Sequence, residues 1–259
     1  LKHLVEIRGT IDNPVKNITI EGVELTGTVR TFMERYEPLL RSDWTVYRGA
    51  AVYLEGTENC KLHRCKLYNL GGNAVFFSGY NRGGEVTGSH LTEIGASAIC
   101  FVGDVEAVRS PSMQYHDFVP FESMDKEKGP KTSLYPVDCR VYDNLIHRIG
   151  LFEKQITGVE LSMCQSITVS HNSIYDTPRA GINISEGTWG GHVIEFNDVK
   201  FKYKEDEELT LKGLSLKLIP NKKIAIVGRS GNGKSTLFNL LLRYFDTTEG
   251  NILIDGIDI

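Results

Sequence analysis

The sequence lacks an excess of basic residues and has no long apolar run. Its 29 Lys and Arg residues stand against 33 Asp and Glu, a net charge of −4. This balance gives no electrostatic basis for binding nucleic acid or an anionic membrane surface. No stretch approaches the roughly 18 consecutive apolar residues of a membrane-spanning helix, and no basic segment followed by an apolar one opens the chain. We therefore expect a globular protein with no nucleic-acid partner.

Paired cysteines and an initiating methionine are also missing. The cysteines are odd in number and occupy apolar positions instead of C-x-x-C pairs, which predicts buried free thiols and argues against a metal site; they are Cys60, Cys65, Cys100, Cys139 and Cys164. The chain opens at Leu1 inside the patterned stretch LVEIRG. From this we expect a fragment of a longer protein.

One short pattern recurs through residues 1 to about 194. Each copy has an aliphatic residue, two mostly polar residues, a small or amide residue, a variable residue, and then Leu, Ile or Val. Six copies align: IEGVEL from Ile20, LHRCKL from Leu62, VTGSHL from Val86, VYDNLI from Val141, VSHNSI from Val169 and IEFNDV from Ile194. A second strand follows each copy after a turn, as in NAVFFSG and SAICFVG.

Short alternating strands with a period of about 20 to 30 residues indicate a solenoid, whose stacked coils bury their inward aliphatic side chains. The fourth position of the pattern carries Cys65, Ser89, Asn144, Asn172 and Asn197. Asn tolerates left-handed turn conformations, and stacked amides can hydrogen-bond from coil to coil. The pattern therefore predicts a mainly β fold, a right-handed parallel β-helix; a β-sandwich with irregular loops is the alternative.

The stretch ITVSHNSIYDTPRAGINISEGTWGGHVIEFNDV, residues 167–199, resembles bacterial right-handed β-helix proteins of the carbohydrate-active, pectin lyase-like type. Some of these proteins are glycoside hydrolases. The resemblance covers most of residues 1–198. It implies a secreted or periplasmic domain that has a polysaccharide as its partner.

Glycoside hydrolysis usually needs two carboxyl groups that flank the scissile bond. The candidate catalytic acids are Glu160, Asp176 and Glu186, with Trp189 to stack on a sugar ring and Arg179 to hold a carboxylate or hydroxyl group. Each acid also has a simpler explanation. Asp176 suits a turn, and Glu186 suits a solvated strand end. Catalysis by this part of the chain therefore stands as an alternative function.

The sharpest motif is GRSGNGKST, which fits the phosphate-loop pattern G-x-x-x-x-G-K-[ST]. KIAIV before it suits a buried parallel strand, and LFNLLLRYF after it suits a helix. Strand, glycine loop and helix form the context that the motif requires. We expect ATP to bind here, its phosphates wrapped by the backbone N–H groups of Gly228, Arg229, Ser230, Gly231, Asn232 and Gly233.

The side chains that follow the loop complete the predicted site. Lys234 would reach the β- and γ-phosphates, the Ser235 hydroxyl would be a ligand of Mg²⁺, and Thr236 would assist at the α-phosphate. ATP and Mg²⁺ are therefore the expected cofactors.

FNDVKFKY together with residues 211–259 resembles the amino-terminal part of an exporter-type ABC transporter nucleotide-binding domain. In that family an aromatic residue of the opening strand stacks on adenine, which points to Tyr203; an ordinary strand aromatic is the alternative. Asn232 stands where Ser or Ala is commoner. The family's Walker B and LSGGQ motifs do not occur before Ile259. We therefore expect ATP binding without hydrolysis, and the family's transmembrane domain and second ATPase subunit are missing partners.

The two patterns meet at Ile194–Val199, which satisfies both of them. The prediction is a truncated chimera, with a parallel β-helix at residues 1–194 and a partial, truncated α/β P-loop ATP-binding domain at residues 195–259. The ATPase part implies the cytoplasmic face of a membrane and the β-helix part a secreted or periplasmic location. The sequence does not choose between these locations.

Overall fold

The computed structural model describes residues 1–40, 44–114, 116–185, 187–191, 194–201, 203–204, 208–218, 233–254 and 257–258. The chain divides into two compact units, Leu1–Trp189 and Gly190–Ile259. Each unit has a hydrophobic core of its own.

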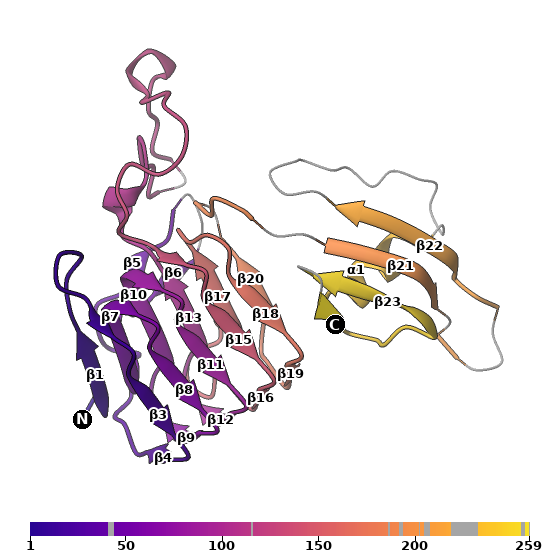
Figure 1. Ribbon diagram of the computed structural model, residues 1–259, viewed down its shortest axis with the longest axis horizontal. Coiled ribbons are helices and arrows are strands. Elements are labelled where there is room, and N and C mark those ends of the chain that lie inside the picture. Colours follow the sequence, from indigo (N-terminus) through magenta and orange to yellow (C-terminus); the bar gives the residue numbers. More distant parts are fainter. Residues whose placement is uncertain are drawn as a thin grey trace. The chain divides into compact units, whose positions relative to one another are not determined.

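Parallel strands of the first unit form three sheets (Figure 1). The largest contains β1 (Val5–Arg8), β7 (Val52–Glu58), β10 (Val75–Arg82), β13 (Ile99–Val102), β17 (Thr157–Ser162) and β20 (Ala180–Ile184), with β2 (Val15–Lys16) and β14 (Pro136–Val137) beside this path. The second contains β3 (Thr19–Glu21), β8 (Lys61–His63), β11 (Glu85–Thr87), β15 (Arg140–Tyr142) and β18 (Thr168–Ser170). The third contains β4 (Glu24–Thr26), β9 (Lys66–Leu70), β12 (His90–Ile94), β16 (Leu145–His147) and β19 (Ser173–Tyr175).

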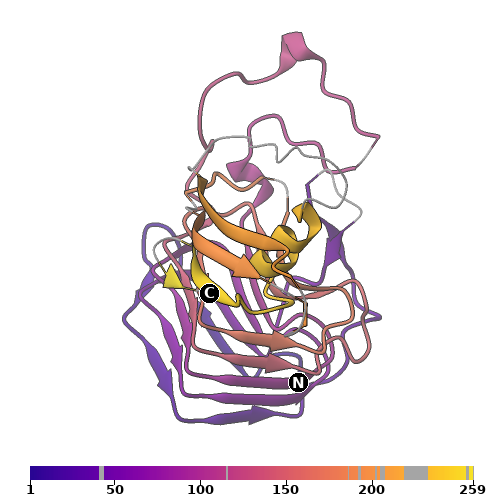
Figure 2. The ribbon, with the colours of Figure 1, turned by 90° about the vertical axis from the view of Figure 1, so that its right-hand side faces the viewer.

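The chain visits these three sheets in turn, so strands far apart in sequence lie side by side (Figure 2). The register follows the sequence repeat. The first positions of five copies are Cα partners in the second sheet, and their last positions are Cα partners in the third, where Leu25, Leu67, Leu91, Ile146 and Ile174 form one row. These inward aliphatics belong to the main core or pack against it. The parallel pairing is that of the predicted mainly β fold and differs from the antiparallel pairing of a β-sandwich.

The turn between the second and third sheets repeats one backbone conformation. Its left-handed residue is Gly22, Arg64, Gly88, Asp143 or His171 in successive passes of the chain. The residues of the amide ladder each follow the left-handed residue by one position. The expectation that the ladder Asn itself would take the left-handed conformation is therefore wrong. The ladder itself is confirmed from Cys65 to Asn172: the N–H groups of Cys65, Ser89 and Asn144 donate to the side-chain oxygens of Ser89, Asn144 and Asn172, respectively.

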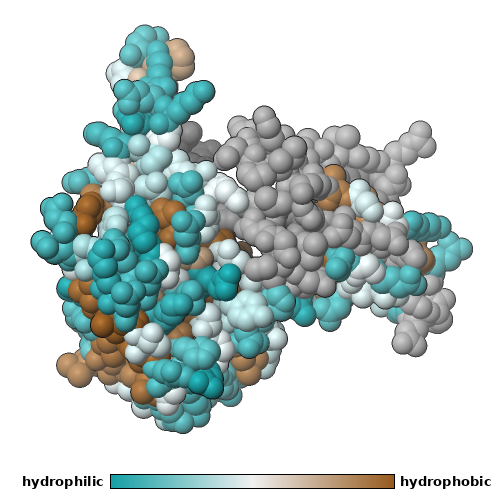
Figure 3. Space-filling view, viewed as in Figure 1, coloured by the Kyte–Doolittle hydropathy of each residue, from teal (hydrophilic) through white to brown (hydrophobic). Residues whose placement is uncertain are grey.

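Two insertions stand outside the repeat. One carries the short hairpin of β5 (Glu37–Pro38) and β6 (Thr45–Val46) and helps to form a second cluster of buried side chains on the outer face of the largest sheet. The other carries the 3₁₀ turns η1 (Val105–Ala107) and η2 (Phe121–Ser123) and projects as an arm. The arm is largely hydrophilic in Figure 3, with a smaller apolar area.

The second unit contains an antiparallel sheet in the order β22 (Leu211–Leu218), β21 (Ile194–Phe201), β23 (Glu249–Ile254) and β24 (Ile257–Asp258). Helix α1 spans Lys234–Leu241. Its buried residues Leu237 and Leu240 pack with Leu211 and Ile252.

The sixth copy of the pattern therefore does not continue the stack. Ile194 is the Cα partner of Leu218 and of Ile254, both in antiparallel pairs, so Asn197 lies in β21 and outside the amide ladder. An aliphatic residue followed by Asn and another aliphatic fits either kind of strand. Only the partner strands decide which sheet the segment joins.

Candidate functional site

The start of α1 is the best-defined part of the predicted phosphate site. Gly233 caps the helix with φ of 75°, in the left-handed region. The left-handed backbone of Gly233 favours glycine, and a Cβ atom there would lie 2.8 Å from Cδ2 of Leu211, whose side chain would have to shift. The N–H of Leu237 donates to the carbonyl oxygen of Gly233 at 2.8 Å, which closes the first turn. The N–H groups before Leu237 have no acceptor within the helix and can face an anion.

Thr236 and Tyr203 are joined at this end of the helix. Thr236 is buried, and its Oγ1 lies 2.9 Å from the Tyr203 hydroxyl in a hydrogen bond. The Tyr203 ring is 46% exposed and meets the Phe245 ring edge-on, with centroids 5.3 Å apart. Tyr203 follows β21 and is not part of that strand. The residue predicted to stack on adenine is thus tethered to the residue predicted to assist the α-phosphate.

Helix α1 is shorter than the sequence suggested. Residues 237–245 read as one helix, but α1 ends at Leu241. Arg243 adopts φ of 53°, its N–H donates to Leu240, and the N–H of Tyr244 donates to Asn239. This pair of hydrogen bonds is the Schellman arrangement, which stops a helix by reversing the handedness of one residue.

The rest of the predicted site is described only in part. Gly228, Arg229, Ser230, Gly231 and Asn232 lie outside the described residues, as does the preceding strand. Lys234 is described as the first residue of α1 and Ser235 as an exposed residue of its first turn.

Among the candidate acids of the first unit, Glu160 is buried. It lies on β17, is 1% exposed, and faces the second cluster rather than the main core. Nδ2 of Asn183 donates to both carboxylate oxygens at 3.0 Å, and Oγ of Ser185 donates at 2.6 Å. Burial raises the pKa of Glu160 to about 7, although these hydrogen bonds oppose the shift. The carboxyl is therefore an interior group and not a surface acid.

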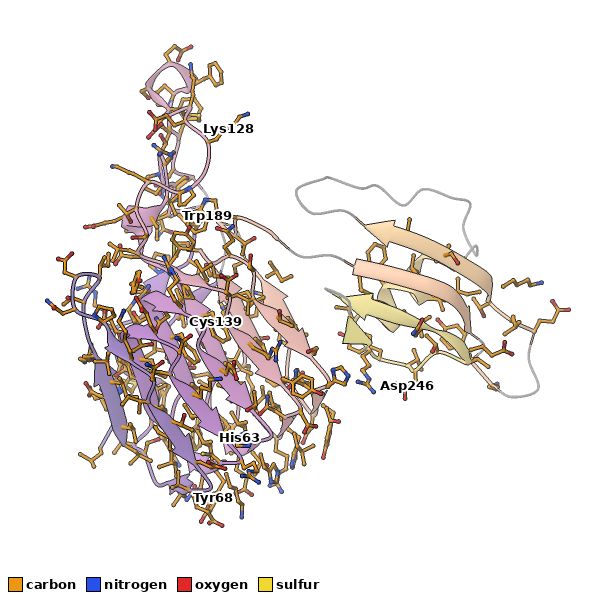
Figure 4. All side chains as sticks on the ribbon, in the orientation of Figure 1. His63, Tyr68, Lys128, Cys139, Trp189 and Asp246 are labelled. Atoms are coloured by element: carbon orange, nitrogen blue, oxygen red, sulfur yellow. The ribbon has the colours of Figure 1, made fainter. Side chains whose placement is uncertain are left out.

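The other residues predicted to handle a carbohydrate are an exposed turn residue, a residue outside the described part of the chain, and two side chains that pack on protein rings. Asp176 is an exposed turn residue with φ of 51°, as its simpler explanation predicts, and Glu186 lies outside the described residues. Trp189 packs against Tyr135, with centroids 4.4 Å apart, near the base of the arm (Figure 4). The Arg179 guanidinium lies 4.5 Å from the centroid of the Trp44 ring. In the structure, Trp189 packs against the ring of Tyr135 and Arg179 packs against the ring of Trp44.

All five cysteines are free and buried, as predicted. Burial raises the pKa of Cys139 to about 12 and also raises the pKa of Cys100 and of Cys164, which keeps these thiols protonated. Cys139 lies among the stacked strands (Figure 4). Within the described ranges, no group of three or more His, Cys, Asp or Glu residues is placed to hold a metal ion. None of the helices in this part of the chain is long and apolar enough to cross a membrane.

The sequence reasoning missed two histidines that the fold brings together. His90 and His147 are 57 positions apart, yet their Nε2 atoms lie 2.9 Å apart. The signal was available in the aligned repeat. If the aligned repeat is extended by one residue, His147 falls opposite Thr92 on the neighbouring strand. Thr92 is two residues after His90, so the two histidines come close together.

Comparisons with known proteins find a likeness to two kinds of protein. A sequence profile of the ABC transporter family matches residues 211–259. An ATP-dependent lipid A-core flippase of Idiomarina loihiensis is 37% identical over 113 residues, which are 41% of this chain and 19% of that protein. A protein of the same name from Haemophilus influenzae is 47% identical over 66 residues, or 26% of this chain and 11% of its own length. The chain thus spans a fifth or less of these relatives.

A solved structure of a glycoside hydrolase resembles most of the chain in fold. It is 17% identical, with a TM-score of 0.55 over 72% of this chain and 34% of that protein. At this identity the likeness concerns the fold alone. Residues 211–259 thus resemble the ABC transporter family, while 72% of the chain shares the fold of a glycoside hydrolase.

Proposed function

We propose that the second unit binds ATP through a Walker A loop at Gly228–Thr236, with Mg²⁺ held by the Ser235 hydroxyl. In this proposal the loop amides wrap the phosphates and Lys234 contacts the β- and γ-phosphates. Thr236 assists at the α-phosphate, and Tyr203 stacks on adenine. The proposal concerns binding.

The observation that carries this proposal is the start of α1 at Lys234, directly after a left-handed glycine. A phosphate loop needs this junction, because the free N–H groups and the positive end of the helix must face the phosphates. The family match begins at residue 211 and includes this junction. The relatives' names, ATP-dependent flippases, agree with ATP as the ligand.

The bond between Tyr203 and Thr236 supports the adenine side of the proposal. It holds an exposed ring beside the first turn of α1, at 2.9 Å between the two hydroxyl oxygens. A ring that stacks on adenine has to lie within one nucleotide's reach of the α-phosphate. The tether keeps Tyr203 within that reach.

We further propose that the first unit is a right-handed parallel β-helix and that the second is a partial ABC-type domain. The ordered visits to three parallel sheets favour a coil, and parallel crossovers are almost always right-handed. Along the sequence, the first compact unit ends at Trp189 and the second begins at Gly190, and β21 pairs with strands of the second unit. Both observations favour a boundary a few residues before the one predicted at residue 194.

MgATP binding by the full chain tests the main proposal. We expect MgATP to raise the unfolding temperature of the second unit, and Lys234→Ala and Ser235→Ala to abolish most of that rise. Lys212→Ala is the matched control, since Lys212 is an exposed lysine of the same unit, on β22. A rise that is absent, or equal in the Lys234→Ala chain, would contradict the proposal.

A second candidate function is polysaccharide binding by the first unit. The observation that favours it is a pair of rings on the repeat, Tyr142 and the exposed His171, whose centroids lie 4.9 Å apart. Rings that reach solvent offer stacking surfaces for sugars. A glycan array with the intact chain and with Tyr142→Ala tests it. Signals that are blank, or unchanged in the variant, would remove this candidate.

A further inference from the structure

The imidazoles of His90 and His147 meet edge to edge. Their Nε2 atoms are 2.9 Å apart and their ring centroids 5.1 Å apart, with planes inclined by 23°. The centroid separation exceeds the nitrogen separation by about the radii of both rings. The two nitrogens therefore lie on the line between the rings and point at each other.

The strand register produces this meeting. His90 opens β12 and His147 closes β16, adjacent strands of the third sheet in which Thr92 is the Cα partner of His147. Leu91 and Ile146, beside the histidines, are buried in the main core. Because side chains alternate along a strand, both histidines are placed on the outer face, where each is partly exposed. A solvent-borne ion can reach them.

Neighbouring groups fix the orientation of the His147 ring. Oγ1 of Thr92 lies 3.5 Å from its Nδ1. The Tyr175 ring stacks on it, with planes 3° apart and centroids 4.9 Å apart. If Nδ1 of His147 donates to Thr92, its Nε2 keeps a free lone pair, which accepts the Nε2 proton of His90. Metal-binding histidines are commonly held in this way by a partner at the second nitrogen.

We propose that His90 and His147 form a binding site for one divalent transition-metal ion of the Ni²⁺ and Cu²⁺ class. Imidazole nitrogens bind such ions at about 2.0–2.1 Å. At that length, two ligands at a right angle are about 2.9 Å apart, whereas two tetrahedral ligands are about 3.3 Å apart. The observed 2.9 Å fits adjacent corners of a tetragonal site. The ion lies to one side of the line between the two nitrogens, so each ring has to turn by about 45° to aim its lone pair at the ion, and water fills the other positions.

Proton balance and nearby charge set the strength of the site. Binding moves the His90 proton from Nε2 to Nδ1, so no proton has to leave the protein. Lys66, the Cα partner of His90, opposes a cation, although its Nζ lies 4.0 Å from a Glu24 oxygen. With only two imidazole ligands and this lysine beside them, we expect moderate affinity.

Calorimetric titration of the tag-free full chain with NiCl₂, without nucleotide, tests the proposal. Ni²⁺ suits the experiment because it does not oxidise thiols. We expect one Ni²⁺ per chain, and loss of saturable binding in His90→Gln and in His147→Gln. Lys66→Gln should tighten binding, and Thr92→Val should weaken it about tenfold. The matched control is His63→Gln, because His63 also contacts a threonine hydroxyl, that of Thr87, from the neighbouring sheet.

Two results would overturn the site: no saturable Ni²⁺ binding by the parent chain, or binding in His90→Gln and His147→Gln that is as strong as in the parent chain. Circular dichroism establishes whether each variant keeps the β-sheet signal of the parent. If one variant unfolds, the other and Lys66→Gln still decide the question. The titration contains no ATP, so its outcome is independent of nucleotide binding.

Discussion

Oδ1 of Asn172 accepts two hydrogen bonds from Asn144, 28 positions earlier, at 3.0 Å from the backbone N–H and 2.9 Å from the side-chain amide. Asn144 repeats the relationship one strand further on, where its Oδ1 accepts the N–H of Ser89 at 2.9 Å. These amides are buried, so each supplies a partner that water cannot. The ladder therefore locks the register of successive passes.

Asn144→Ala should lower the free energy of unfolding by about 3 kcal/mol, because it leaves the N–H of Ser89 and the carbonyl of Val86 buried without these partners. Urea denaturation followed by circular dichroism measures the loss. The control Asn13→Ala removes an exposed loop amide and should change stability little. An Asn144→Ala chain as stable as the parent would show that the ladder contributes no stability.

Glu160 should make the first unit less stable as pH rises. Its folded pKa of about 7 exceeds the ordinary value of 4.5, so the folded state holds the proton more tightly. The contribution is complete below about pH 4.5, falls as pH rises toward 7, and levels off above that. The upper limit of the change is about 3 kcal/mol.

Glu160→Gln tests this expectation, because Gln keeps an acceptor for Asn183 without the charge. The variant should be more stable than the parent at pH 8 and equal to it near pH 4.5. Unfolding curves at a series of pH values measure the difference, and Glu24→Gln, at an exposed glutamate, is the control. A difference that does not vary with pH would refute the assignment to Glu160.

The Tyr203–Thr236 hydrogen bond should stabilise the first turn of α1 by about 1 kcal/mol. A double-mutant cycle with Tyr203→Phe and Thr236→Val measures the coupling as the protection of α1 against amide hydrogen exchange. Tyr203→Phe keeps the ring and loses the tether, so it should weaken ATP binding less than Tyr203→Ala does. Fully additive effects on exchange would mean that the hydroxyls are not coupled.

Arg48→Lys should destabilise the first unit by about 2 kcal/mol. The guanidinium donates to Glu37, to the Ser78 hydroxyl and to the Gly103 carbonyl, and a lysine ammonium cannot reproduce this planar set. Thermal unfolding measures the loss. The control Arg64→Lys changes a more exposed arginine, and an equal effect of both changes would contradict the prediction.

Much of the first unit could be predicted because the repeat encodes its own register. The aliphatic positions of five copies alternate inward, so aligning the sequences also aligned the strands and the amide ladder. The sixth copy at Ile194 has the same pattern but joins an antiparallel sheet. The alternation of polar and apolar residues specifies which side chains share a face of the strand, but it does not specify which strand pairs with it.

The candidate sites were predictable to different degrees. Glycine, lysine and hydroxyl residues at fixed spacing predict a phosphate loop, because such a loop is local to one turn and one helix, and the structure describes this segment only from Gly233 onward. The environment of Glu160 was not predictable, since burial and the side chains of Asn183 and Ser185 surround it only in the folded chain, and only the surroundings in space shift a pKa.

The sequence by itself determined the repeat, the inward rows of aliphatic side chains and the buried thiols, because each depends on spacing along the chain. Only the tertiary structure decided that β21 joins the second unit, that Trp189 and Arg179 are engaged by protein rings, and that His90 meets His147. Such contacts depend on which distant strands become neighbours, and many pairings satisfy the same local pattern of polar and apolar residues.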